Sequence, residues 1–80
     1  METVQKYLRV DRREISFLKF IIEAYDGVAL LRTIDSETGI VVLHVSPGCE
    51  NEIEAVITEL KKEIMLENIG TKELYNTNLA

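Results

Sequence analysis

The chain has 80 residues, enough for one hydrophobic core but not for a second independent domain. Its 46% hydrophobic and 29% charged residues, with only four glycines and one proline, exclude a disordered or low-complexity chain. Nine Lys and Arg against fourteen Asp and Glu give a net charge of −5, which disfavours nucleic acid as a partner, because phosphate backbones are recognised by clustered positive charge.

Residues 3–10 form the first predicted element, a strand. Apolar and polar residues alternate there, with Lys6 as the one polar interruption of the apolar row. A period near two is typical of a strand with one buried face. The apolar row is Val4, Leu8 and Val10, and the other row is Gln5, Tyr7 and Arg9.

A helix is predicted to follow, ending at Tyr25 or Asp26. Residues 11–14, with Asp first and Glu last, fit a capping box, in which the first acid accepts from the first turn and the second reaches back. Gly27 is expected to end the helix, because glycine adopts the left-handed conformation at little steric cost.

A β-hairpin is predicted for residues 28–45, where two runs rich in Val, Leu and Ile flank a polar turn that ends in Gly39. We place Ile34 opposite Ile40. One face is then nearly all apolar and comprises Ala29, Leu31, Thr33, Val41, Leu43 and Val45. The other face carries aliphatic side chains beside two that can be charged: Val28, Leu30, Arg32, Ile34, Ile40, Val42 and His44.

A second helix is predicted from Glu50 to about Met65. Its apolar positions span an arc of about 100°, as in a helix that packs one side on a sheet. These positions are Ile53, Val56, Ile57, Leu60 and Ile64. Residues 66–80, with a turn signal at 68–70, form either a short fourth strand or a frayed tail. We therefore expect a domain over residues 1–67 and a tail or edge strand over residues 68–80.

The element order is strand, helix, strand, strand, helix, with a possible last strand. It predicts an α+β fold, a two-layer ferredoxin-like sandwich. In this arrangement the first strand pairs with the third, the second takes an outer edge, and a fourth strand would lie on the free side of the first.

Several segments resemble a family of short bacterial proteins of unknown function. They are Asp11-Arg12, Tyr25-Asp26-Gly27-Val28, Arg32-Thr33-Ile34-Asp35, and Gly39-Ile40-Val41 leading to Val45-Ser46-Pro47-Gly48-Cys49-Glu50. The arrangement is also similar to the ACT domain, a ferredoxin-like module that often binds amino acids and regulates a partner enzyme, usually as a dimer. Amino-acid-binding ACT domains typically have a glycine in the turn into the first helix, where this chain has Arg12-Arg13-Glu14.

The first helix has more apolar surface than one sheet can cover. Its apolar residues sweep an arc of about 220°. No helix is expected over the mixed face of the hairpin either. We therefore expect a homodimer or a protein partner at an interface formed by Phe17, Phe20, Ala24, Ile34, Ile40 and Val42. The alternatives are that Phe17 or Phe20 folds over the sheet edge, and that the tail covers the open face.

Four side chains on the open sheet face form a candidate ligand site: Tyr7, Arg9, Arg32 and His44. Arginine offers a planar fork to carboxylates, so a small anion or carboxylate is the expected ligand. The alternative is ordinary solvated strand charge. His44 has no evident acidic partner to orient it for catalysis or at a metal, so an interface or pH-sensitive contact is the preferred interpretation.

Cys49 is a candidate reactive thiol, because it precedes a helix whose dipole favours the thiolate. Glu50 and Glu52 oppose that effect, and a small buried or capping residue is the preferred interpretation. It is the one cysteine of the chain, which excludes an internal disulfide and fits a reducing compartment.

Together these features predict a non-enzymatic ACT-like module that self-associates and binds a small metabolite, without metal or cofactor. The alternatives are an adaptor or small subunit of a larger complex with no ligand of its own, and a thiol-dependent enzyme that uses Cys49. No apolar run approaches the roughly 20 residues of a membrane span. Residues 1–5 lack the basic start of a signal peptide, so we expect a cytoplasmic protein without a membrane partner.

Overall fold

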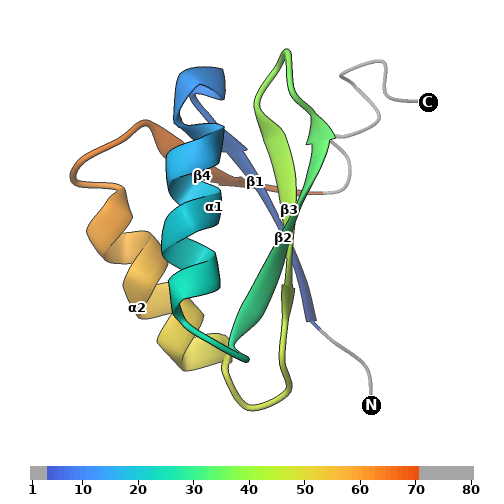
Figure 1. The fold of residues 1–80 in the computed structure, drawn as a ribbon, viewed down its shortest axis with the longest axis vertical. Helices are drawn as coiled ribbons and strands as arrows, with labels where there is room; N and C mark the ends of the chain where they lie inside the picture. The colour runs from blue at the N-terminus through green and yellow to red at the C-terminus, as the bar shows by residue number, and fades with distance from the viewer. Residues whose placement is uncertain (1–3, 71–80) are drawn as a thin grey trace.

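A four-stranded sheet carries two helices on one of its faces in the computed structural model, which describes residues 4–70 (Figure 1). The elements in chain order are β1 (Val4–Val10), the 3-10 turn η1 (Arg12–Glu14), α1 (Ile15–Ala24), β2 (Ala29–Asp35), β3 (Ile40–Val45), α2 (Glu50–Leu60) and β4 (Leu66–Ile69). Neither helix is long and apolar enough to cross a membrane.

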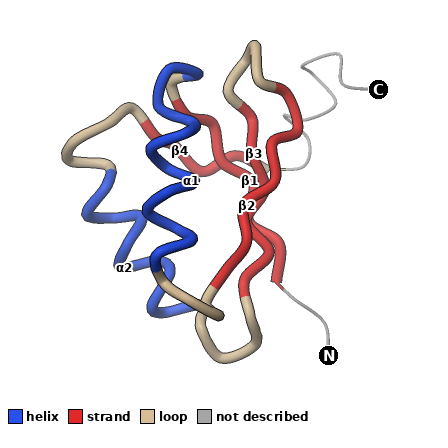
Figure 2. The backbone as a smooth tube through the Cα atoms, in the orientation of Figure 1, coloured by secondary structure: helices blue, strands red, loops and turns tan. Residues whose placement is uncertain are grey.

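The strand order is β2-β3-β1-β4, and every neighbouring pair is antiparallel. Figure 2 shows both helices on the same side of the strands. The two central strands are therefore β1 and β3, with β2 and β4 at the edges. This is the order of the ferredoxin-like sandwich, so the predicted fold class and the predicted place of each strand are confirmed. The short β4 covers the edge of β1 that would otherwise be open.

The core lies between the sheet and the helices. Each strand contributes alternate apolar residues, and each helix contributes one side. In α1 the buried residues are Leu18 and Ile22, whereas in α2 all four predicted apolar positions up to Leu60 are buried. The fully buried side chains are Leu8, Leu18, Ile22, Ile40, Leu43, Ile53, Ile57, Val10, Val41 and Val45.

Lys6, the polar interruption in the apolar row of β1, is explained by an ion pair with α2. Its Nζ lies 3.2 Å from Oε1 of Glu54, and its side chain is only a quarter exposed. A lysine can bury its methylene stem and keep its ammonium at the surface. Lys6 therefore occupies a core-facing strand position at the edge of the helix layer.

The capping box before α1 is only half formed. Asp11 Oδ1 accepts from the amide of Arg13, which caps η1, but the Asp11 amide donates to the Met65 carbonyl oxygen at 3.2 Å. In the expected capping box, the Glu14 side chain would accept a hydrogen bond from the Asp11 amide. In the structure, a carbonyl oxygen in the loop before β4 accepts it instead. The α-helix proper begins at Ile15 and ends at Ala24, before Gly27 at φ 81°.

The predicted hairpin register is correct up to Thr33 and wrong beyond it. Thr33 pairs with Val41 as expected, but Asp35 rather than Ile34 lies opposite Ile40. Ile34 is the extra residue of a bulge, which shifts the register by one. Gly39 closes the turn at φ 77°, and a Cβ there would overlap the Val10 carbonyl oxygen, so this position requires glycine.

The second helix is shorter than predicted, because it ends at Leu60 rather than near Met65. The chain turns over residues 61–64 so that Leu66 can pair with Val10 and be buried. The fourth strand is thus present, but it spans residues 66–69 and crosses the expected boundary at residue 67. The rest of the predicted tail, residues 71–80, lies outside the described residues.

Candidate ligand-binding site

A hollow of about 300 Å³ lies on the sheet face that the helices do not cover. It is formed by side chains from β1, β2 and β3. Three of the four residues predicted as a ligand site line it, namely Tyr7, Arg32 and His44. The other lining residues are Gln5, Thr33, Ile34 and Val42.

The strand register accounts for this grouping. Tyr7 on β1 and Arg32 on β2 both lie opposite Val42 of the central strand β3, one on each side. Neighbouring strands are about 4.8 Å apart, so the backbones that carry Tyr7 and Arg32 are separated by about 10 Å. Val42 is buried and forms the floor between them. A small ligand can therefore contact both walls at once.

His44 occupies the next row of the same face. It lies opposite Gln5 on one side and Leu30 on the other. The Gln5 Oε1 atom accepts a hydrogen bond of 3.0 Å from the Tyr7 hydroxyl, which ties the two β1 residues together. Gln5 was absent from the predicted site, although its place two residues before Tyr7 puts it on the same face.

Arg9 does not line the hollow. Its Nη1 lies 3.2 Å from Oε1 of Glu67 on the edge strand β4, and this pair is partly exposed. The predicted group of four is therefore divided: Arg9 has a carboxylate partner from within the fold, and the other three share the hollow.

Arg32 differs from Arg9 in its surroundings. It is exposed, and within residues 4–70 no acidic side chain forms an ion pair with it. Asp35, three residues along the same strand, uses both carboxylate oxygens in the hairpin turn, where it accepts from the Glu37 amide and the Thr38 hydroxyl. The Thr38 hydrogen bond lowers the pKa of Asp35. The nearest acid along β2 is thus engaged locally, and the guanidinium of Arg32 is available to an external anion.

The open face is less exposed than the sequence suggested. Leu30 is 67% exposed and Ile34 is partly buried, as expected for side chains without a helix above them. Ile40 and Val42, however, are 0% and 4% exposed, so the expectation that they lie at an accessible interface is wrong. Both residues lie on β3, which has β1 and β2 on either side, whereas Leu30 lies on the edge strand β2.

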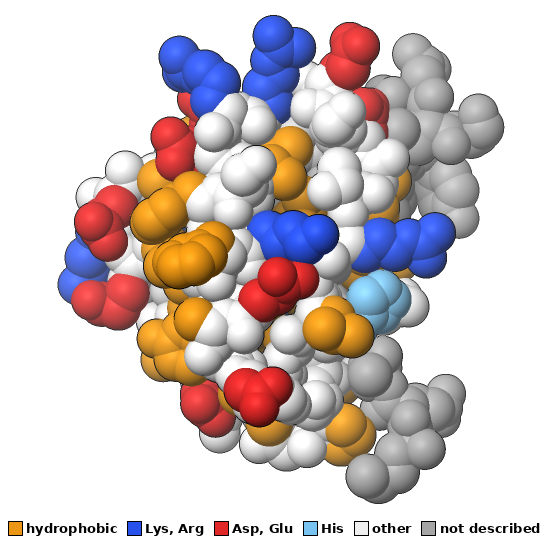
Figure 3. All heavy atoms as spheres, in the orientation of Figure 1, with side chains coloured by type: hydrophobic (Ala, Val, Ile, Leu, Met, Phe, Trp, Pro, Cys, Tyr) orange, Lys and Arg blue, Asp and Glu red, His pale blue; other side chains and the backbone are white. Residues whose placement is uncertain are grey.

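The expected surplus apolar surface on α1 is present. Phe20 is 71% exposed, Phe17 is 40% exposed, and Ala24 is exposed beside them. The alternative in which Phe20 folds over the sheet edge is therefore wrong. Figure 3 shows hydrophobic side chains gathered over α1 and toward α2, with acidic side chains around them.

Cys49 is the N-terminal cap residue of α2, but its side chain makes no capping hydrogen bond. It is partly buried and packs against the core. The preferred interpretation was a small buried or capping residue, and the structure gives a partly buried side chain at the cap position without a capping hydrogen bond. In the part of the chain that the structure describes, no group of three or more His, Cys, Asp or Glu side chains could hold a metal ion.

The comparison with known protein families finds a match over most of the chain. A family model described as a domain of unknown function, DUF4911, matches residues 8–64. The chain belongs to this family. The matched range runs from β1 through α2 and includes Arg32 and His44, with Tyr7 immediately before it. No curated protein and no solved structure matches the chain.

Proposed function

We propose that this chain is a non-enzymatic binding module that takes a small carboxylate, such as an amino acid, in the hollow of the open sheet face. The observation that carries the proposal is the convergence of Arg32, Tyr7 and His44 on one hollow, together with the lack of an acidic partner for Arg32 among the described residues. A guanidinium without a partner is suited to bind a carboxylate through two parallel hydrogen bonds.

The dimensions and chemistry of the hollow favour a small ligand. Its volume of about 300 Å³ is at the lower end of the range for ligand pockets. Val42 and Ile34 supply an apolar surface for a short side chain, and the Tyr7 hydroxyl and the His44 ring supply polar groups near the guanidinium. Binding and orientation are the roles that these residues can fill without a catalytic group.

Self-association through α1 is the second part of the proposal. Phe17, Phe20 and Ala24 form an exposed apolar surface on one side of that helix, which is the kind of patch that a second copy covers in small homodimers. We further propose a bacterial, cytoplasmic module, in which the lone Cys49 stays a free thiol. Sedimentation at micromolar concentration tests the assembly, and a 9.1 kDa species alone would contradict it.

A protein adaptor without a small ligand is the alternative function, and the same exposed aromatic residues of α1 favour it. Thermal-shift screening against amino acids and small carboxylates separates the two functions, because a ligand that binds only the folded state raises its stability. A carboxylate-binding module is stabilised by at least one compound, and a pure adaptor by none.

The decisive test compares two arginine substitutions that change the charge equally. For a carboxylate found in the screen, we expect Arg32→Gln to weaken binding at least tenfold, since a hydrogen bond to a charged group contributes about 1.5–3 kcal/mol. Arg9→Gln should change the affinity less than threefold, because Arg9 already pairs with Glu67 and does not line the hollow. Equal losses in the two variants would show general charge attraction and contradict the site.

A further inference from the structure

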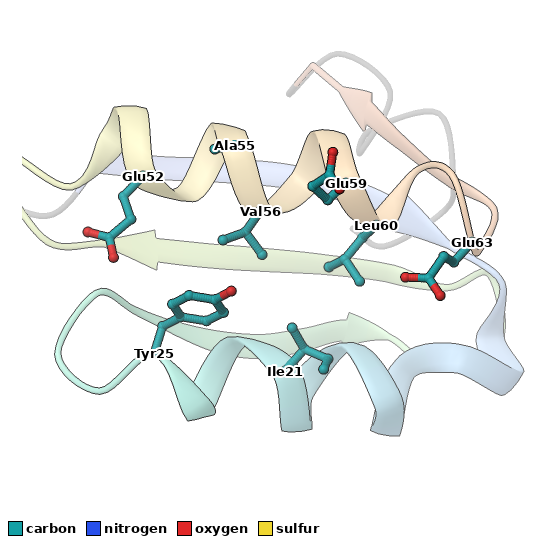
Figure 4. A pocket seen from close by; sticks show the side chains of 8 residues that line it. All are labelled: Ile21, Tyr25, Glu52, Ala55, Val56, Glu59, Leu60 and Glu63. Atoms are coloured by element: carbon teal, nitrogen blue, oxygen red, sulfur yellow. The ribbon is translucent and has the colours of Figure 1, made fainter.

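A groove of about 420 Å³ runs between α1 and α2, on the opposite side of the molecule from the ligand hollow (Figure 4). Ile21 of α1 and Tyr25, the residue that follows this helix, point into the groove from one side. Val56 and Leu60 of α2 point into it from the other side, and these four side chains form its apolar floor. This apolar floor continues onto the exposed surface of α1, because Phe17 lies one helical turn before Ile21.

The α2 side of the groove is acidic. Glu52, Glu59 and Glu63 line it, with the small Ala55 between the first two. In Figure 4, Glu52 and Glu63 lie toward opposite ends of the groove. Glu52 and Glu59 are seven residues apart, which is two helical turns or about 10 Å along α2. The carboxylates are thus spaced along the length of the apolar floor.

These carboxylates are only partly neutralised within the chain. Lys62 forms an exposed ion pair of 2.9 Å with Glu59. Among residues 4–70, no cation forms an ion pair with Glu52 or Glu63. An apolar floor beside carboxylates spaced by helical turns matches a helix with an apolar stripe and flanking Lys or Arg residues.

A second copy of this chain fits the groove poorly. Its exposed apolar helix, α1, contains Lys19 as its one cation and carries Glu23 four residues later. The copy also brings the same net charge of −5. A foreign helix with several cations complements the acidic wall better, because opposite charges across an interface favour association and like charges oppose it.

We propose that the groove between α1 and α2 docks a basic amphipathic helix of another protein. The apolar stripe of that helix lies on Ile21, Tyr25, Val56 and Leu60, and its Lys or Arg residues face Glu52, Glu59 and Glu63. This site is separate from the carboxylate hollow, and either can exist without the other.

A model peptide tests this proposal with the full chain. The probe is an acetylated and amidated peptide of about 14 residues, a length of about 21 Å as a helix. It is built on Ala, with Leu at i, i+4 and i+7 and Lys on both sides of that stripe. A second peptide with Glu in place of Lys is the charge control. Binding is measured by NMR titration of backbone amides and by fluorescence anisotropy at low and high salt.

Two charge-matched double variants provide the protein controls. E52K/E63K reverses two groove carboxylates, whereas E23K/E37K reverses two exposed carboxylates that do not line the groove. Each pair raises the net charge by four. Since Glu52 lies in the first turn of α2, where a carboxylate suits the helix dipole, E52Q/E63Q with its control E23Q/E37Q repeats the test with less risk to folding.

We expect the Lys peptide to shift amides around Ile21, Tyr25 and Val56, and to bind more weakly as salt increases. E52K/E63K should weaken binding at least tenfold and E52Q/E63Q at least threefold, with less than twofold change in the control pairs. Equal losses in groove and control variants, or equal binding of the Glu peptide, would overturn the proposal. Shifts of the Val56 and Leu60 amides with protein concentration alone would also overturn it, because a second copy would then occupy the groove itself. Shifts confined to Phe17, Phe20 and Ala24 would reflect the proposed self-association through α1.

Discussion

The two faces of the sheet are formed by the same strands but differ in what surrounds them. On the helix-covered face, Leu8, Val41 and Leu43 are fully buried against α1 and α2. On the open face, Leu30 is largely exposed, and Arg32 and His44 line a hollow. Most positions of the covered face are constrained by packing, so its buried residues determine the fold. The open face is under fewer packing constraints and can hold polar residues that bind a ligand.

The largest expected effect contrasts one leucine on each face. Leu43→Ala removes a fully buried side chain and should lower the free energy of unfolding by about 2–5 kcal/mol. Leu30→Ala removes a side chain that is already 67% exposed and should cost about 0.5 kcal/mol or less. Urea unfolding measures both. Similar losses would mean that the open face is also packed against something, which would contradict the division between the faces.

A smaller effect is expected where the open face meets the edge strand β4. Arg9→Gln removes the ion pair with Glu67, which is partly exposed, and should lower the free energy of unfolding by about 0.2–1 kcal/mol. The double variant R9Q/E67Q should show little further loss, because each substitution removes the same pair. A loss that is fully additive would show that the two side chains do not interact in solution.

The smallest expected effect concerns acid stability at the start of η1. Hydrogen bonds from the Arg13 side chain and amide lower the pKa of Asp11 from 3.8 to about 2. The folded-state pKa is depressed, so the stabilisation is present above about pH 4 and is lost as the pH falls toward 2. Asp11→Asn should therefore lose less stability than the wild type between pH 5 and pH 2 in thermal unfolding. Glu23→Gln is the control. If this variant loses as little stability between pH 5 and pH 2 as Asp11→Asn does, the assignment to Asp11 is contradicted.

Hydrophobic periodicity was sufficient to predict the fold. Alternation in β1, the two apolar runs on either side of the hairpin turn and the apolar arc of α2 predicted the layers, and the element order predicted the strand order. Features that depend on contacts distant in sequence were not predicted. The sequence Lys61-Lys62-Glu63 contains no helix-ending residue, and α2 stops before it because Leu66 must reach Val10. An apolar residue such as Ile34 suits a strand with or without a bulge. The residues around it therefore give no local signal for the register shift between Thr33 and Asp35.

The candidate site was predicted to a similar extent and for similar reasons. Tyr7, Arg32 and His44 share a face because side chains alternate between the two faces along each strand. This alternation is a local property that can be read from the sequence. Arg9 alternates onto the same face, but its partner Glu67 lies on β4, and the sequence left open whether this strand forms. The alternation of side chains places Ile40 on the open face but does not predict its burial, because burial depends on the surrounding residues of the folded chain.

The central claim is that the open face binds a carboxylate at the hollow of Tyr7, Arg32 and His44. The most direct measurement is an NMR titration of the labelled full chain with a panel of amino acids and small carboxylates, in which the backbone amides and the His44 ring are followed. We predict saturable shifts confined to these three residues and their neighbours on β1, β2 and β3, and the loss of these shifts in Arg32→Gln. No saturable shift from any compound, or shifts that persist in Arg32→Gln, would contradict the claim.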